Sequence, residues 1–299
     1  YYNENMKTVP RLIDTFIPTR YMLNLSLEHY DDNDHSFSGD VSIVGTLKKG
    51  NEILLHAKDL DIDFVLVSEM GSNGKTKKSK KATFSYGEFD TLIISADDLR
   101  PGEYFITIAY HGKVTDAMHG LYPCYFTHDG TKKHLLATQF ESHHAREVFP
   151  CVDEPAAKAT YDLMLITKPG LTALSNMPVK WSEEKNGLMT TCFEQTPRMS
   201  SYLLAFVVGE LHKKTAHTTS GVEVNIWATP AQSTETLDFA LDIATRSIDF
   251  YDEYFGVPYP LPKSDHVALP DFSSGAMENW GLITYRESCL LADPKLTPE

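Results

Sequence analysis

Two carboxylates in this sequence could recognise a cation, and the first is Glu278. It lies in the glycine-flanked apolar run GAMENWG, where an ordinary buried strand would carry Val or Ile. An unpaired buried carboxylate is costly, so Glu278 needs a partner. If the run is a strand at the rim of a cleft, the backbone of Gly275 and Ala276 could pair with an extended peptide whose end would meet Glu278. A protonated α-amino group, with a reference pKa of about 8, would suit that place.

The second carboxylate is Glu141, in the stretch TQFESHHAREVFPCVDEPAAKATY. On an extended backbone, Gln139 and Glu141 leave the same face and could line one wall of a pocket. A second carboxylate there would sharpen a preference for a free N-terminus. The alternatives are structural: Glu141 would pair with Arg146 on a solvated strand face, and Glu278 would be held by Arg286 at a sheet edge.

The other polar residues of this stretch are predicted to be structural. His143 and His144 are adjacent, so a strand or a helix would point them apart, which favours a surface or supporting role over a metal site. Asp153 and Glu154 lie in a proline-flanked turn, where such residues set backbone geometry. No histidine is followed by Glu, so the sequence contains no HExxH zinc helix, and it contains no GxGxxG, P-loop or GxSxG motif. We therefore predict no catalytic and no metal-ligating residue within these 299 residues.

Up to about residue 210 the sequence is typical of β structure. From Tyr21 to Leu27 apolar and polar residues alternate, which predicts a strand with one face toward a core. Similar runs follow at Ile53–His56, Ile62–Val67, Thr91–Ser95 and Tyr104–Tyr110. Their spacing predicts a sandwich or saddle of antiparallel strands.

After residue 210 the pattern changes to that of an α+β segment. Thr229, Pro230 and Gln232 resemble an N-cap, a first-turn proline and a capping-box partner. Apolar residues then recur every three or four positions from Leu237 to Phe255, which predicts a long helix that ends at the following glycine and proline. We expect two domains, one over residues 1–210 and one over residues 211–299.

Composition limits the possible partners and compartments. The formal net charge of −14 argues against nucleic acid, because binding a phosphate backbone needs a basic surface. We expect no membrane contact, since no apolar run approaches the roughly 20 residues of a membrane helix and no leader opens the chain. The four cysteines form no CxxC pair, which favours reduced thiols in a cytoplasmic protein.

The stretches GAMENWGLITYRES and TQFESHHAREVFPCVDEPAAKATY resemble the two signature stretches of the aminopeptidase N family of zinc metalloaminopeptidases, the gluzincins. The resemblance covers the whole chain and implies a mainly β, saddle-shaped domain followed by the start of an α+β, thermolysin-like catalytic domain. It implies that Glu278 binds the substrate's free amine with help from Glu141, and that Gln139 lines the first side-chain pocket. The substrate-binding residues that it implies are Gln139, Glu141, Gly275, Ala276, Met277, Glu278 and Asn279.

The resemblance also implies zinc, whose ligands the sequence lacks. In the family a HExxH helix and a later Glu follow, and this sequence ends at Glu299 before either of them. We therefore expect an N-terminal fragment, inactive alone, of a zinc aminopeptidase that hydrolyses peptides with a free N-terminus. One alternative is a noncatalytic relative that acts as a protein-interaction scaffold. Another is an epoxide hydrolase of the same fold, whose motif usually has Gly in place of Ala276.

Overall fold

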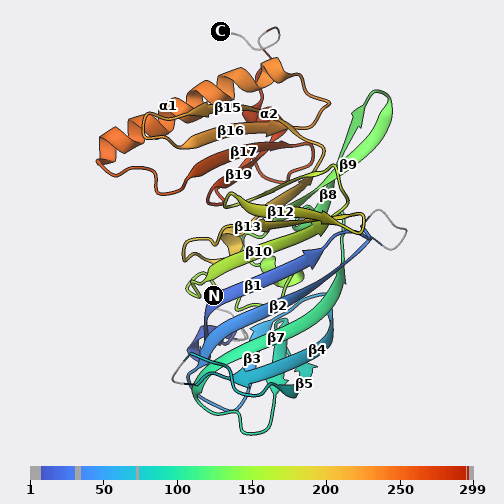
Figure 1. The fold of residues 1–299 in the computed structure, drawn as a ribbon, viewed down its shortest axis with the longest axis vertical. Coiled ribbons are helices and arrows are strands. Elements are labelled where there is room, and N and C mark those ends of the chain that lie inside the picture. Colours follow the sequence, from blue (N-terminus) through green and yellow to red (C-terminus); the bar gives the residue numbers. More distant parts are fainter. Residues whose placement is uncertain (1–7, 31–34, 72–73, 294, 296–299) are drawn as a thin grey trace, which may run out of the picture.

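The first of three sheets forms one end of an elongated molecule (Figure 1). In this computed structural model, residues 8–30, 35–71, 74–293 and 295 are described. The first sheet has ten strands in the order β12-β13-β10-β1-β2-β7-β4-β5-β6-β3. Their bounds are Val179–Lys185, Leu188–Phe193, Thr160–Thr167, Phe16–Ser26, Ser36–Leu47, Gly102–Lys113, Leu60–Glu69, Lys80–Tyr86, Thr91–Ser95 and Ile53–His56.

Two smaller sheets complete the molecule. The second has the order β11-β14-β9-β8 (Thr172–Ser175, Phe206–Gly209, Thr131–Gln139 and Gly120–His128). The third, at the opposite end in Figure 1, has the order β15-β16-β17-β19-β18 (His212–His217, Glu223–Ala228, Lys263–Leu269, Leu282–Arg286 and Ala276–Met277). The helices are α1 (Asp238–Phe255) and α2 (Glu287–Leu290), with 3₁₀ turns η1 (Leu12–Asp14), η2 (Ala145–Glu147), η3 (Ser201–Leu203) and η4 (Thr234–Leu237).

The fold class predicted from the sequence is confirmed, because a mainly β part is followed by an α+β part. The strands of the first two sheets all end by residue 209, and those of the third begin at residue 212. This change of sheet is the place where we propose the domain boundary, after residue 210. The predicted strands at Ile53–His56 and Thr91–Ser95 are confirmed as β3 and β6.

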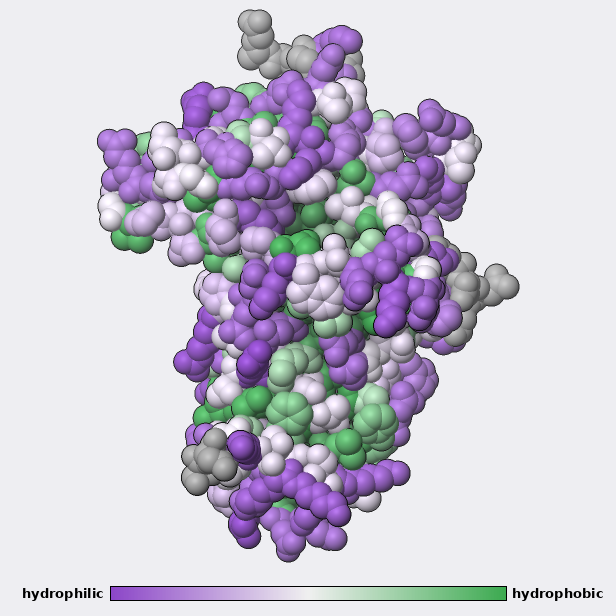
Figure 2. Space-filling view, viewed as in Figure 1, coloured by the Kyte–Doolittle hydropathy of each residue, from purple (hydrophilic) through white to green (hydrophobic). Residues whose placement is uncertain are grey.

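Alternating burial along the strands explains the first sheet. In β1 the residues Tyr21, Leu23 and Leu25 are buried, while Met22 and Asn24 between them are half-buried, as the period-two pattern predicted. Figure 2 shows hydrophobic residues gathered over the lower half of the molecule, where β2, β7 and β4 lie in Figure 1, between hydrophilic margins.

One pairing in the first sheet departs from the predicted antiparallel arrangement. β1 pairs in parallel with β10, a strand that begins more than a hundred residues later, with Tyr21 beside Tyr161. The two buried rings stack with centroids 5.1 Å apart and an interplanar angle of 3°. The Tyr21 hydroxyl also accepts a hydrogen bond of 3.0 Å from the Val152 backbone N–H. Packing between distant segments therefore decides this pairing, and no local pattern encodes it.

The acidic turn is structural, as predicted. Glu154 accepts hydrogen bonds from the backbone N–H groups of Leu12 (2.6 Å) and Ile13 (3.2 Å). Buried Asp153 accepts from the Ser201 hydroxyl at 2.6 Å and from Arg146 Nε at 3.2 Å. Both carboxylates thus join segments that are far apart in the sequence.

The long helix begins later than predicted. The capping pattern placed its start at Thr229 and Pro230, whereas α1 begins at Asp238 after η4. The Thr229 carbonyl accepts hydrogen bonds from the backbone N–H of Gln232 (3.0 Å) and from His212 Nε2 (3.1 Å). Because β15 supplies that histidine, a tertiary contact holds the predicted cap in a turn.

The end of α1 is confirmed, and its apolar face is covered only in part. Gly256 ends the helix with a φ of 63°, a conformation that favours glycine. Leu237 and Ala240 at the start of the predicted stripe are buried, whereas Tyr251 and Phe255 near its end are 53% and 65% exposed.

Two further findings concern the cysteines and membrane contact. All four cysteines are free, and Cys124 and Cys151 are buried. No helix among the described residues combines the length and the apolar character needed to cross a membrane.

Candidate functional site

Strand β18 forms the open edge of the third sheet. It pairs on one side with β19, with Ala276 opposite Tyr285 and Met277 opposite Thr284. The Gly275 carbonyl already accepts a hydrogen bond of 2.9 Å from the Arg286 N–H. Because backbone groups alternate in direction along a strand, those of Ala276 face away from β19. Of the two residues expected to dock a peptide backbone, only Ala276 therefore offers both of its backbone groups at the open edge.

Side chains alternate in the same segment. Ala276, Glu278 and Trp280 are exposed, whereas Met277 and Asn279 are each 1% exposed. Met277 packs into the main hydrophobic core, and Asn279 Nδ2 donates to the Thr284 hydroxyl at 3.2 Å. Met277 and Asn279 thus hold the segment from below, and Glu278 is presented outward.

Glu278 is exposed, so the interpretation of it as a buried carboxylate was wrong. It lines a groove of about 510 Å³ whose walls include Tyr259, Leu261 and Trp280. Arg286 does not hold it, since that guanidinium donates to the carbonyls of Phe272 and Ser273. Within the described part of the chain, the Glu278 carboxylate makes no hydrogen bond and no ion pair. The Glu278 carboxylate therefore lies without a partner beside the apolar walls of this groove.

Two buried polar side chains hold the backbone just after Glu278. Asn176 Nδ2 donates to the Trp280 carbonyl at 2.8 Å, and Lys263 Nζ donates to the Gly281 carbonyl at 2.8 Å. Lys263 also bonds to Asp265 Oδ2 at 2.7 Å. Burial lowers the pKa of Lys263, and the nearby Asp265 opposes that effect. Sequence analysis missed Asn176 and Lys263, because neither lies in a recognisable motif.

Gly281 is required by this arrangement. Its φ is +76°, and a Cβ at this position would lie 2.0 Å from the Asn176 carbonyl oxygen. The glycine that follows the tryptophan in GAMENWG therefore lets the first part of the chain approach the segment closely.

The second predicted stretch lies at the end of β9. Gln139 pairs with Gly120 of β8 and is buried, and among the described residues its Oε1 has no hydrogen-bond partner. Glu141 follows and is exposed. The predicted structural alternative, an ion pair between Glu141 and Arg146, does not form, because Arg146 binds Asp153 instead.

Strand β8 joins the two stretches. The Tyr122 hydroxyl donates to the Asp271 carbonyl at 3.1 Å, and the Tyr125 N–H donates to the Asp271 carboxylate at 2.7 Å. Asp271 lies four residues before Gly275, so the partner strand of β9 is attached to the loop that leads into β18. The structure thus links the two stretches without a direct contact between Glu141 and Glu278.

The histidine pair does not behave as predicted. The rings of His143 and His144 stack with centroids 4.6 Å apart, because this segment is a turn and neither a strand nor a helix. His144 also approaches His119 and Glu147, and these three form the one group with metal-ligand spacing in the ranges that the structure describes. The only local indication of this group in the sequence was the spacing of three residues between His144 and Glu147.

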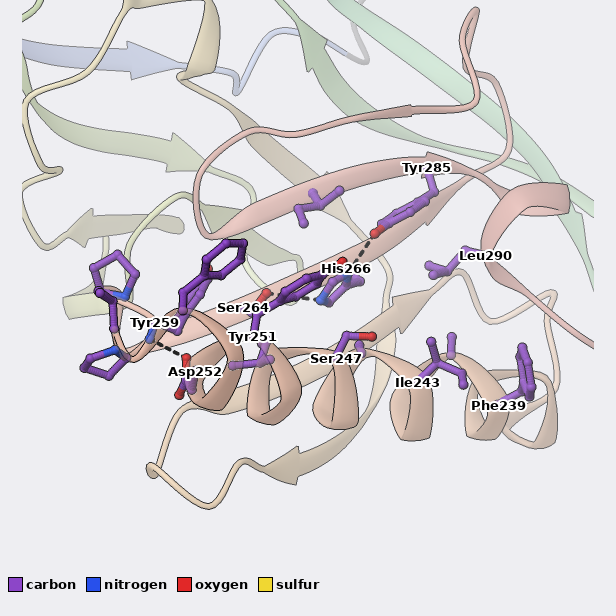
Figure 3. A pocket seen from close by; sticks show the side chains of 18 of the residues that line it. Phe239, Ile243, Ser247, Tyr251, Asp252, Tyr259, Ser264, His266, Tyr285 and Leu290 are labelled. Atoms are coloured by element: carbon purple, nitrogen blue, oxygen red, sulfur yellow. Dashed lines mark hydrogen bonds between the residues drawn. The ribbon is translucent and has the colours of Figure 1, made fainter.

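A larger groove of about 660 Å³ lies between α1 and strands β17 and β19 (Figure 3). Buried His266 bridges its floor, with Nε2 3.1 Å from the Ser264 hydroxyl and Nδ1 3.0 Å from the Tyr285 hydroxyl. Burial lowers the pKa of His266 to about 4. Among the described residues that line this groove, Asp252 is the one carboxylate, and it accepts from the Tyr259 N–H at 2.7 Å. This part of the chain therefore gives the larger groove no free carboxylate, and we take the Glu278 groove as the candidate site.

Comparison with known protein families gives two matches. The description "Peptidase M1 N-terminal domain" matches residues 17–203, and "Peptidase family M1 domain" matches residues 239–299. Together they cover nearly all of the first sheet and the residues of the candidate site, whereas strands β14, β15 and β16 lie between the two matched ranges.

Curated proteins similar to this chain include three aminopeptidases. Aminopeptidase N of Lactococcus lactis subsp. lactis is 49% identical over 291 residues, which is 96% of this chain and 32% of that protein. Puromycin-sensitive aminopeptidase of Caenorhabditis elegans is 42% identical over 94% of this chain and 29% of its own length. Aminopeptidase M1 of Arabidopsis thaliana is 36% identical over 97% of this chain and 33% of its own length. The chain spans about a third of the length of these relatives.

Proposed function

The chain belongs to peptidase family M1, and on that premise we propose that it supplies the amine-recognition part of a zinc-dependent aminopeptidase that removes N-terminal residues from peptides. The observation that carries this proposal is the exposed, unpartnered carboxylate of Glu278 beside the open edge of β18. An extended peptide that pairs with Ala276 would bring its terminal ammonium to this carboxylate. A charge-assisted hydrogen bond would then form between the two groups.

The second stretch supports the same proposal. Exposed Glu141 would place a second negative charge beside the bound ammonium. The unpartnered Oε1 of buried Gln139 would accept a hydrogen bond from the bound residue. These contacts would hold the first peptide bond in one position relative to the chain, which is how binding energy lowers an activation barrier through positioning. A peptide with a blocked N-terminus lacks the ammonium and would bind poorly.

The residues around Glu278 do not fit the zinc ion. The described residues lining its groove contain no set of three metal ligands, and the sequence has no HExxH. When bound, zinc would polarise the scissile carbonyl and activate water. We propose that its ligands come from residues outside this sequence and that these 299 residues alone do not hydrolyse peptides. We also propose a cytoplasmic location, which the free cysteines favour.

Substitution of Glu278 tests the proposal in the longer protein that contains this chain. Glu278→Ala should lower kcat/KM on an alanyl chromogenic substrate by about 10- to 100-fold, the value of a hydrogen bond between charged groups. Glu253→Gln, an exposed acidic residue on α1, is the matched control and should retain full activity. Wild-type kcat/KM in Glu278→Ala would refute the amine-anchor role.

A noncatalytic relative that serves as a scaffold predicts a different result. The longer protein would then bind peptides or proteins without turnover, and neither substitution would change any hydrolysis. Peptide hydrolysis that depends on added zinc, measured on the longer protein, distinguishes the two functions.

A further inference from the structure

Three side chains from two segments of the chain converge at the 3₁₀ turn η2. His119 lies just before β8, while His144 and Glu147 lie at η2. The potential ligand atoms of these three residues all lie within 4.8 Å of one another. None of these three residues takes part in the proposed recognition of the substrate amine.

The geometry of the cluster directs both histidines at one carboxylate. His119 Nδ1 lies 2.7 Å from Glu147 Oε2, and His144 Nδ1 lies 3.1 Å from Glu147 Oε1. The two imidazole rings stack with centroids 4.1 Å apart and an interplanar angle of 25°. Both histidines thus direct their Nδ1 atoms at the Glu147 carboxylate, as ligands of one metal ion would.

The distances match metal coordination after small side-chain shifts. With metal–ligand bonds of about 2.0–2.1 Å, neighbouring ligand atoms of a tetrahedral site lie roughly 3.3 Å apart. The distance of 3.1 Å from His144 to Glu147 is already near that value, whereas the distance of 2.7 Å from His119 must lengthen when an ion enters between the two groups. The Glu147 side chain is 11% exposed, whereas that of His119 is 38% exposed, so the carboxylate is sheltered and an ion can still reach it.

Lys58 at present neutralises the carboxylate. Its Nζ lies 2.9 Å from Glu147 Oε1, and the hydrogen bond to Glu147 raises the pKa of Lys58. A divalent ion and this ammonium cannot share the same carboxylate at close range, because they repel each other. The Lys58 side chain is 37% exposed and can move into solvent when an ion binds.

We propose that His119, His144 and Glu147 form a binding site for a divalent late transition-metal ion such as Zn²⁺, which displaces Lys58. Two imidazoles and one carboxylate suit zinc better than calcium or magnesium, which prefer ligand sets made of oxygen alone. The proposal does not depend on the peptidase function, because all the ligands belong to this chain and binding can be measured without turnover.

The site also has a structural connection to the predicted substrate residues. A Cβ on Gly120 would lie 2.9 Å from Glu147 Oε2, so Glu147 packs closely on this glycine. Gly120 pairs with Gln139 across β8 and β9. A bound ion would therefore tie together the two segments that flank Gln139 and Glu141.

Calorimetric titration of the chelator-treated 299-residue chain with Zn²⁺ provides the test. One ion per chain should bind, and His119→Ala and His144→Ala should each weaken the affinity by about tenfold or more. His217→Ala, an exposed histidine far along the sequence, is the matched control and should leave the affinity unchanged. The Co²⁺ form should lack the charge-transfer absorption of thiolate ligands, which excludes the cysteines as the binding groups.

Lys58→Met gives a second, independent measurement. It removes the competing ammonium and retains the aliphatic stem, so Zn²⁺ should bind several-fold more tightly. Unchanged or weaker affinity in Lys58→Met would refute Glu147 as a ligand. The absence of one-to-one binding in the wild type, or wild-type affinity in both histidine variants, would overturn the site.

Discussion

The buried ammonium group of Lys263 donates hydrogen bonds of 2.8 Å to the Gly281 carbonyl and to the Ser175 carbonyl. It thereby joins β17 to the residue that follows the candidate site and to a strand of the second sheet. Its charge is balanced by Asp265 at 2.7 Å. The segment that presents Glu278 is thus held by a charged group from its own sheet and by Asn176 beyond the predicted domain boundary.

Replacement of Lys263 should destabilise the chain strongly. Lys263→Met leaves the Asp265 carboxylate buried and unpaired and removes the donor of two carbonyls, so the free energy of unfolding should fall by about 3–5 kcal/mol. Urea unfolding measures this loss of free energy. Lys213→Met, which breaks the exposed pair with Glu223, is the control and should cost less than about 1 kcal/mol. Equal losses in the two variants would contradict the role of Lys263.

Gly281→Ala should disturb both stability and the candidate site. The new Cβ would meet the Asn176 carbonyl in addition to the strain of a positive φ. Gly221→Ala is a matched control, since Gly221 has a φ of +90° and open space around it. We expect Gly221→Ala to cost about 1 kcal/mol and Gly281→Ala clearly more, by urea unfolding. A loss no larger at Gly281 would show that the close approach to Asn176 is unimportant.

Stability should fall in mildly acidic solution because of His266. Burial lowers its pKa from 6.5 to about 4 in the folded chain, so between these values the unfolded state binds more protons. The free energy of unfolding is therefore unaffected by this group above pH 6.5 and decreases as the pH falls from 6.5 toward 4. The slope from one such proton is at most about 1.4 kcal/mol per pH unit.

The measurement compares two histidine variants across that pH range. His266→Gln removes the titrating group and should make the pH dependence of stability shallower, whereas exposed His217→Gln should retain the wild-type dependence. If both variants follow the wild type, another group controls the acid sensitivity.

Glu141 and Glu278 should act on one ammonium. In the longer protein, Glu141→Gln and Glu278→Gln should each lower kcat/KM for peptides with a free N-terminus, and the double variant should lose less than the sum of the two free-energy changes. Strict additivity would indicate that the two carboxylates contact different groups.

Local patterns in the sequence determined most of the strands and the end of the helix. Alternation along Tyr21–Leu27 predicts β1, and Gly256 predicts the end of α1, because burial on one face and a left-handed glycine are properties of neighbouring residues. Glu278 could also be recognised as unusual from its neighbours alone, because it is a carboxylate within the apolar run GAMENWG. The start of α1 was mispredicted, because His212 from another strand holds the Thr229 carbonyl.

Only the tertiary structure decided how the distant segments meet. The contacts concerned join residues that are 18 to more than a hundred positions apart. They are the parallel pairing of β1 with β10, the hydrogen bonds of Lys263 and Asn176 to the backbone after Glu278, and the contact of His119 with Glu147. The exposure of Glu278 belongs to the same class, since it depends on which face of its segment packs on the core through Met277. Contacts of this kind follow from the packing of whole sheets against one another. A short sequence pattern does not predict which distant segment will pack against it.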